Sequence, residues 1–373
     1  MAPASRMAAR LADLSHAQLV EIAAAGCDAS TQVKNRADAI LAAHKPLAQW
    51  AVEGVLLSSD LVPHLLAPLQ LEDGAAAAVC SLWAEGWKAT SEGRRRLRRV
   101  AFDFPPDLLY ENSLSMAVVP GGDKLVMRSG TTVRILDRGM SSTGTSFDWP
   151  SSFAGVAASE DFTYVAGESG ISSLNHIGTE VAKYVDPEKL IAYPMLRPGG
   201  GLLFCVLYKG ADSEHDEIVA LDAQTLQPRH RFGLSLLIDA RGMAVVGEEL
   251  FVCDCGNHRL QVFSLTGEHR RSITGEWKRP EALCFVKDRL YLVEEYDYEE
   301  DEEGELVNPQ PGRRIFVLSL QGDTLQVYTH PLIEGQTFEA LCCFDGKLLA
   351  AVKGQESDLP YDTYQGVVAL CGV

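Results

Sequence analysis

The chain has 373 residues, of which 46% are apolar, and its 33 Lys and Arg against 51 Asp and Glu give a formal net charge of −18. The length exceeds one ordinary domain, and the apolar fraction is sufficient for a folded core, which excludes wholesale disorder. The acidic charge argues against a surface that neutralises phosphates, so we do not expect nucleic-acid binding.

The N-terminal sequence and the placement of the cysteines both predict an intracellular protein. Residues 1–19 are Ala-rich and interrupted by charged residues, unlike a secretory signal, and no apolar run approaches the length of a membrane span. Five of the nine cysteines lie in apolar, strand-like runs, which is typical of buried thiols in a reducing compartment: Cys205, Cys253, Cys284, Cys342 and Cys343. We expect a cytoplasmic location, with the nucleus as the alternative.

Helical apolar spacing extends from the first residues to about residue 96. The segment 1–56 is short and Ala-rich, so a packed helical pair and a partly frayed arm are both consistent with it. The segment 57–96 predicts a helical hairpin, with Asp60 capping the first helix, Pro63 in its first turn and Asp73 capping the second helix. The second helix is expected to present one common face, made of Val79, Leu82, Trp83 and Trp87.

The stretch 57–87 resembles a divergent F-box. The matching positions in its first half are Leu57, Asp60, Leu61, Leu65, Leu66, Leu69, Leu71 and Asp73, followed by Val79, Cys80 and Trp83 at the family's Val-Cys-x-x-Trp end. Ser58 stands where the family usually has Pro. The resemblance implies a hairpin that docks on a Skp-type linker protein of a cullin–RING ubiquitin ligase. It assigns the linker-binding or box-core surface to Leu61, Leu65, Leu66, Leu69, Val79 and Trp83.

The basic run 94–99 separates the two kinds of periodicity. It has the composition of a nucleic-acid contact or import signal, but a solvated linker is favoured because the rest of the chain is acidic.

Beyond residue 97 the spacing becomes strand-like, and short β-branched runs form six clusters, which indicates a repeat architecture. The predicted clusters are 114–119, 125–128 and 133–136; 153–157, 163–166 and 171–174; 191–196, 202–207, 218–221 and 228–232; 242–246, 250–253, 259–263 and 270–273; 282–286, 290–293, 314–318 and 325–328; and 340–344, 348–352 and 366–370.

The sixth cluster is one strand short, and the apolar-alternating run 98–104 is otherwise unassigned. A ring of four-stranded blades is closed by such an N-terminal strand. We therefore predict a mainly β protein: a six-bladed β-propeller over 97–373, closed by 98–104 and preceded by the small helical domain. Seven blades fit the spacing less well.

The segment 254–263 predicts a turn followed by a strand, with the positive φ of the turn at Gly256 or Asn257. It resembles the core of an NHL repeat through Asp254, Asn257, Arg259, Gln261, Val262 and Phe263. The fifth cluster repeats the pattern, with Arg314 in the place of Arg259.

Two further segments have residues that suggest chemistry. The pattern Cys253-x-Cys255-x-x-His258 lacks the second ligand pair that zinc needs, so strand and turn positions are the favoured interpretation and no metal or cofactor is expected. The acidic run 294–305 predicts a solvated loop on one rim of the propeller, with a grip on a basic partner as the alternative. No catalytic motif is present.

The expected function is a non-enzymatic adaptor that is monomeric within a complex. The propeller would recruit a protein partner, and the F-box-like hairpin would bind the Skp-type linker. One alternative is a stand-alone propeller scaffold that binds protein or RNA. Another is a propeller hydrolase or lyase, which needs three or more carboxylates or histidines converging from separate blades.

Overall fold

A computed structural model describes most of the chain beyond residue 60. The described residues are 61–67, 77–102, 114–148, 155–167, 170–175, 177–186, 191–208, 215–294, 312–330, 336–355 and 362–373. The chain divides into two compact units, a helical one within Met1–Arg98 and a β unit that spans Arg99–Cys371. Among the described residues, no helix has the length and apolar content that a membrane crossing requires.

The described part of the helical unit contains α5 (Val62–Leu66), α6 (Ser81–Ala89) and α7 (Ser91–Arg94). Pro63 lies in the first turn of α5, where its missing N–H is harmless. The helix α6 begins at Ser81, so Val79 precedes it and the prediction that Val79 lies on this helix was wrong. The predicted caps Asp60 and Asp73 lie outside the described residues.

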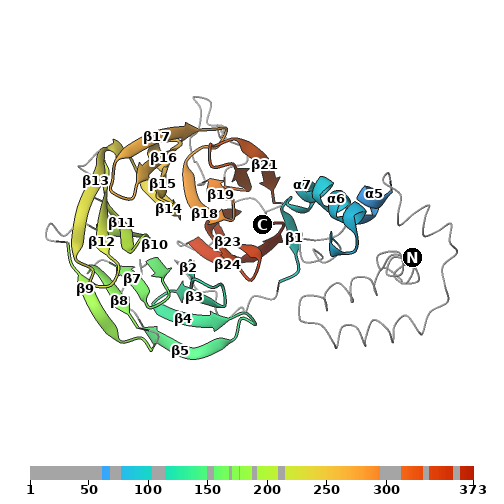
Figure 1. Ribbon diagram of the computed structural model, residues 1–373. Coiled ribbons are helices and arrows are strands. Elements are labelled where there is room, and N and C mark those ends of the chain that lie inside the picture. Colours follow the sequence, from blue (N-terminus) through green and yellow to red (C-terminus); the bar gives the residue numbers. More distant parts are fainter. Residues whose placement is uncertain are drawn as a thin grey trace. The chain divides into compact units, whose positions relative to one another are not determined.

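The β unit is a ring of six sheets with four strands each (Figure 1). From the innermost strand outward, blade one is β2 (Leu114–Val118), β3 (Lys124–Ser129), β4 (Thr132–Asp137) and β5 (Ser142–Asp148), and blade two is β6 (Gly155–Ala158), β7 (Thr163–Gly167), β8 (Gly170–Leu174) and β9 (Glu180–Tyr184). Blade three is β10 (Ile191–Gly199), β11 (Leu202–Tyr208), β12 (Asp216–Asp222) and β13 (Pro228–Leu237), and blade four is β14 (Ala240–Val246), β15 (Glu249–Asp254), β16 (Arg259–Ser264) and β17 (His269–Thr274). Blade five is β18 (Pro280–Val286), β19 (Arg289–Glu294), β20 (Arg314–Leu318) and β21 (Thr324–Thr329), and blade six is β22 (Gln336–Phe344), β23 (Lys347–Gln355), β24 (Asp362–Cys371) and β1 (Arg98–Val100).

This topology confirms the prediction of a six-bladed propeller. The clusters predicted from the sequence match inner and middle strands of every blade, whereas β5 and β9 were not predicted. Both are outermost strands with mostly exposed side chains, so they lack the apolar alternation on which the prediction depended. Middle strands can be continuously apolar because neighbouring blades cover both of their faces, as in the fully buried stretch of β11 from Leu203 to Leu207.

The ring closes at blade six. Strand β1 lies at the outer edge of β24, so the blade combines chain segments from the two ends of the β unit. Side chains of blades one and six share one core, in which Leu114 and Met116 pack with Phe344 and Leu349. Comparable cores lie between blades one and two, two and three, three and four, and four and five.

Close approach of the inner strands limits the residues that fit beside the axis. A Cβ atom added at Gly242 on β14 would lie 2.8 Å from the Cα of Ala282, from the carbonyl oxygen of Glu281 and from the backbone nitrogen of Leu283, all on β18. These are backbone atoms, which do not move aside as a flexible side chain does. Gly242 therefore sets the contact between blades four and five.

We expect Gly242→Ala to lower the free energy of unfolding of the β unit by about 1 to 3 kcal/mol, because the inner strands of two blades must separate. Urea denaturation followed by tryptophan fluorescence and circular dichroism measures this loss. The control is Gly93→Ala in α7, where no atom lies within 4 Å of the added Cβ. Equal stabilities of the two variants would contradict this account.

Candidate functional site

The carboxylate of Asp254, at the end of β15, is the centre of the repeat motif in blade four. It is fully buried and accepts hydrogen bonds from the Ile238 backbone N–H at 2.9 Å and from Arg259 Nε at 2.8 Å. Asn257 Nδ2 at 2.9 Å and Gln261 Nε2 at 3.2 Å also donate to it. These hydrogen bonds connect the loop that precedes β14 to the turn between β15 and β16. A buried carboxylate needs such a set of hydrogen-bond donors to offset its loss of hydration.

The turn in this motif differs from the expectation. A short 3₁₀ turn covers Cys255–Asn257, and the left-handed residue is His258, with φ 56°, instead of Gly256 or Asn257. Gly256 is required for a different reason: a Cβ there would lie 2.6 Å from Cγ2 of Ile238. The side chain of Asn257 is occupied by Asp254, which explains why this position needs an amide donor.

Blade five repeats the arrangement with a longer carboxylate. Glu294, at the end of β19, is fully buried, pairs with Arg314 at 2.7 Å and accepts a hydrogen bond from the Lys278 backbone N–H at 2.7 Å. Burial raises the pKa of Glu294, although the bonds from Arg314 oppose this shift. Glu294 is therefore a structural residue of the blade and not part of a solvated acidic loop, while 295–305 lie outside the described residues.

The two apolar residues of the motif pack on opposite faces of blade four. Val262 packs into the core shared with blade five, and Phe263 packs into the core shared with blade three. Adjacent residues of a strand point to opposite faces, so this pair ties the blade to both neighbours.

The Cys-x-Cys-x-x-His pattern is divided among different environments. Cys253 belongs to the core between blades four and five, Cys255 is buried in the 3₁₀ turn, and His258 Nδ1 accepts a hydrogen bond from the Arg279 backbone N–H at 3.1 Å. Burial raises the pKa of the Cys253 thiol well above its usual value. Within the described residues, no group of three or more His, Cys, Asp or Glu side chains is arranged to hold a metal ion.

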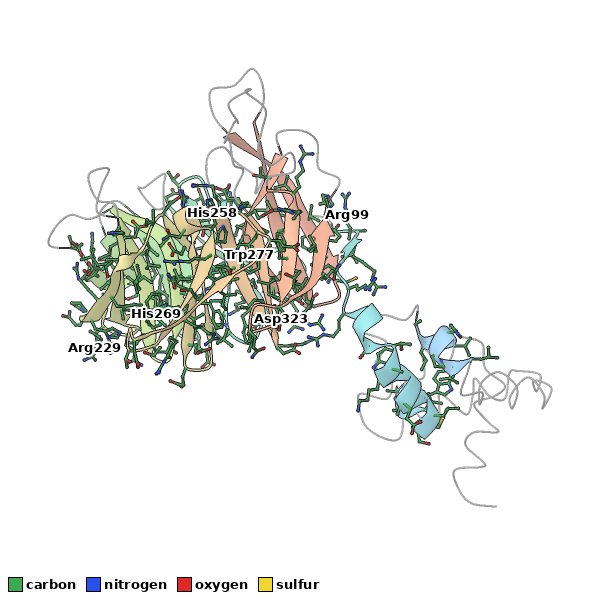
Figure 2. All side chains as sticks on the ribbon, turned by 90° about the horizontal axis from the view of Figure 1, so that it is seen from above. Arg99, Arg229, His258, His269, Trp277 and Asp323 are labelled. Atoms are coloured by element: carbon green, nitrogen blue, oxygen red, sulfur yellow. The ribbon has the colours of Figure 1, made fainter. Side chains whose placement is uncertain are left out.

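A cluster of charges that the sequence analysis did not single out lies where β14 and β18 begin. Asp239 pairs with Arg241 at 2.7 Å and with Arg279 at 2.9 Å, and Arg241 lies 3.7 Å from Glu281. His258 is on the same face of the ring, whereas Arg229, His269 and Asp323 are on the opposite face (Figure 2). The signal in the sequence is the placement of charges around the first residue of two successive inner strands, Asp239-Ala240-Arg241 at β14 and Arg279-Pro280-Glu281 at β18.

The helical hairpin separates its leucines into a buried and an exposed set. Leu66 and Trp83 are 1% and 8% exposed and pack with Val62, while Val79 packs against this cluster as a partly buried side chain. Leu61 and Leu65 are instead 42% and 38% exposed. Leu69, the sixth predicted residue of this surface, lies outside the described residues.

The close packing of α5 on α6 depends on Gly86. A Cβ at this position would lie 2.7 Å from Cγ1 of Val62 and 3.2 Å from Cδ1 of Leu66. The helices therefore meet through Val62, Leu66 and Gly86, which leaves Leu61 and Leu65 on another side of α5.

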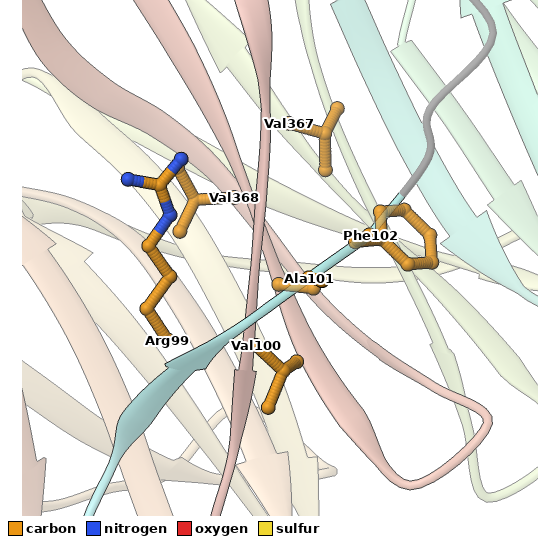
Figure 3. Close-up of a pocket in the computed structure, with 7 residues that line it drawn as sticks. Arg99, Val100, Ala101, Phe102, Val367 and Val368 are labelled. Atoms are coloured by element: carbon orange, nitrogen blue, oxygen red, sulfur yellow. The ribbon is translucent and has the colours of Figure 1, made fainter.

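A cavity of about 370 Å³ adjoins the closing strand β1 (Figure 3). Most of the surface that lines it is polar, and the lining residues are Arg99, Val100, Ala101, Phe102, Val367, Val368 and Ala369. Val100, Phe102 and Val367 also pack against the core shared by blades six and one. These residues belong to β1, to the two positions after it and to β24, so the cavity lies where the ring closes.

Comparison with known proteins supports the same architecture. The NHL repeat family matches residues 237–263, which extend from the end of β13 to β16. No curated protein matches the sequence significantly.

Solved structures of several propellers are similar to this chain. A luciferin-regenerating enzyme shares 13% identity with a TM-score of 0.52, over 74% of this chain and 95% of that chain. A streptogramin B lyase shares 14% identity with a TM-score of 0.48, over 73% of this chain and 87% of that chain. The WD40 β-propeller domain of Doa1 shares 11% identity with a TM-score of 0.48, over 70% of this chain and 79% of that chain. At 13% identity the similarity to the luciferin-regenerating enzyme establishes the fold alone.

We expect Asp254→Ala to lower the free energy of unfolding by about 3 to 5 kcal/mol, because it leaves the Arg259 guanidinium and a buried backbone N–H without their acceptor. Chemical denaturation of the full chain measures the loss. Asp323→Ala is the control, since this carboxylate is exposed and accepts a local hydrogen bond from Ser319 Oγ within a turn of blade five. A loss as small as that of the control would show that the motif does not hold the blade together.

The buried Asp216 is expected to destabilise the fold when its carboxylate is charged, in contrast to Asp254. It accepts one hydrogen bond, from the Ala240 backbone N–H at 2.6 Å, and burial raises the pKa of this carboxyl above the usual 3.8. The folded state then binds the proton more tightly than the unfolded state, so stability decreases as pH rises from about 4 through the folded-state pKa.

Asp216→Asn keeps the acceptor and removes the buried charge. We expect this variant to be more stable than the natural protein at pH 7, and the difference to disappear below about pH 4. Unfolding curves at pH 3.5, 5 and 7 measure it. A variant that is less stable at every pH would contradict the assignment of a desolvated carboxylate.

Proposed function

We propose that this protein is a non-enzymatic adaptor, in which the helical hairpin binds a Skp-type linker protein of a cullin–RING ubiquitin ligase and the propeller recruits a protein partner. The observation that carries the proposal is the exposure of Leu61 and Leu65 beside the buried Leu66. The proposal also rests on the resemblance of 57–87 to an F-box.

The position of the two exposed leucines supports helix-in-groove binding. Residues four apart lie on the same side of a helix, so Leu61 and Leu65 form one apolar contact at the start of α5. The interior of the hairpin is already filled by Val62, Leu66 and Trp83. Large apolar side chains that remain on the surface of so small a unit favour a partner with an apolar groove.

Protein is favoured over RNA as the partner of the propeller. The net charge of −18 opposes the approach of a phosphate backbone, and the face marked by His258 has a mixture of acids and bases instead of a basic patch. Mixed charges at a rim are suited to a protein surface of complementary pattern.

We expect the natural chain to co-purify with a Skp-type linker. The double variant Leu61→Ala with Leu65→Ala should reduce the amount of recovered linker by about tenfold or more, because both apolar anchors are lost. Pull-down with purified linker followed by quantitative blotting measures the recovery.

The control is the double variant Leu325→Ala with Val327→Ala. These side chains on β21 are 49% and 40% exposed, so the change removes a similar apolar surface from the propeller. Both variants should keep the unfolding temperature of the natural chain. Absence of linker from the natural chain would overturn the proposal in favour of a stand-alone propeller scaffold, and so would equal recovery by the two variants.

A further inference from the structure

Arg197, near the end of the inner strand β10, has a guanidinium group without a partner among the residues that the structure describes. Its Nε is buried and makes no hydrogen bond, and no ion pair or hydrogen bond joins its side chain to any residue that the structure describes. The residue as a whole is half-buried, so part of it still reaches solvent. In contrast, Arg259 and Arg314 each bind a buried carboxylate.

The electrostatic neighbours of Arg197 place it at the axis of the propeller. Arg197 belongs to blade three, and the groups that interact with its charge are the thiols of Cys284 on β18 and Cys342 on β22. These strands are the innermost ones of blades five and six. Inner strands of blades three, five and six come together only around the centre of the ring (Figure 1).

The neighbouring thiols do not neutralise this charge. Burial raises the pKa of Cys284 to about 12 and that of Cys342 well above its usual value, so both are uncharged thiols at neutral pH. Arg197 keeps its proton under all physiological conditions. A permanent positive charge therefore lies in a partly desolvated place, and no described carboxylate serves as its counter-ion.

A buried charge without a partner destabilises a fold, and proteins normally pair it with an acid or a ligand. Elsewhere in the ring the buried carboxylates of Asp254 and Glu294 pair with the partly exposed guanidinium groups of Arg259 and Arg314. We propose that Arg197 anchors a binding site at the propeller axis for a small molecule with an oxyanion, either a carboxylate or a phosphate group.

The groups around Arg197 limit the chemical class of ligand that fits the site. A guanidinium presents its N–H donors in a planar fork that matches the two oxygens of a carboxylate or phosphate, which a single ammonium does not. The nearby thiols are weak hydrogen-bonding groups and behave as small apolar surfaces. The site therefore suits a ligand with one strongly anionic end and an otherwise weakly polar body.

The test compares the unfolding temperature of the full chain in sodium phosphate, sodium acetate and sodium chloride at equal ionic strength. We expect phosphate or acetate to raise the unfolding temperature by about 2 to 4 °C over chloride, because an anion that binds only the folded state stabilises it. A response to phosphate alone identifies a phosphate ligand, and a response to acetate identifies a carboxylate ligand.

Arg197→Met removes the charge and keeps much of the side-chain volume. We expect this variant to unfold at the same or a higher temperature than the natural chain in chloride, and to lose the response to phosphate and acetate. Arg229→Met is the matched control, because Arg229 is exposed and paired with Asp222 at 2.7 Å. It should keep the full response of the natural chain.

Two results would overturn the proposal. The first is the absence of any anion response in the natural chain, and the second is a response that Arg197→Met retains. A large decrease of the unfolding temperature of Arg197→Met in chloride would likewise overturn it, because Arg197 would then stabilise the ring without a ligand.

Discussion

Closure of the ring is the constraint on which the rest of the structure depends. Blade six takes β22, β23 and β24 from one end of the β unit and β1 from the other, and its core with blade one includes Leu114 and Phe344. An open ring would leave sheet edges and apolar faces exposed, at a cost that no single blade could offset. Closure also forces six inner strands around one axis, so residues such as Gly242 and Arg197 acquire neighbours that are distant in sequence.

The buried carboxylates show how an acidic chain uses charge inside an apolar ring. Asp254 and Glu294 occupy equivalent places in blades four and five, and each joins an arginine at the start of the third strand to a backbone N–H before the first strand. One ion pair thus fixes two connections at once, which keeps the blade regular without apolar contacts at its rim. The polar motif residues are engaged in this way, so the proposed protein partner would have to be bound by side chains outside the motif.

Much of the fold could be predicted from the sequence, because inner and middle strands are apolar on both faces and are separated by turn residues. The outer strands β5 and β9 escaped prediction since their faces meet solvent. The turn after Asp254 was predicted with the wrong left-handed residue, because the 3₁₀ geometry that gives His258 a φ of 56° depends on packing against Ile238. Arg197 could not be recognised at all, since its unpaired state depends on strands from three blades meeting at the axis.

The overall charge of −18 does not prevent an anion from binding at the axis. At physiological ionic strength, interactions between exposed charges are largely screened beyond about 8 Å, so surface acids on distant blades contribute little at Arg197. A guanidinium in a partly desolvated place is screened far less, and its field dominates locally. The same argument explains why the acidic surface and the cationic axis can serve different ligands. Under the two proposals, a protein partner would meet the mixed charges of the rim, whereas a small oxyanion would meet one arginine that no carboxylate of the described chain neutralises.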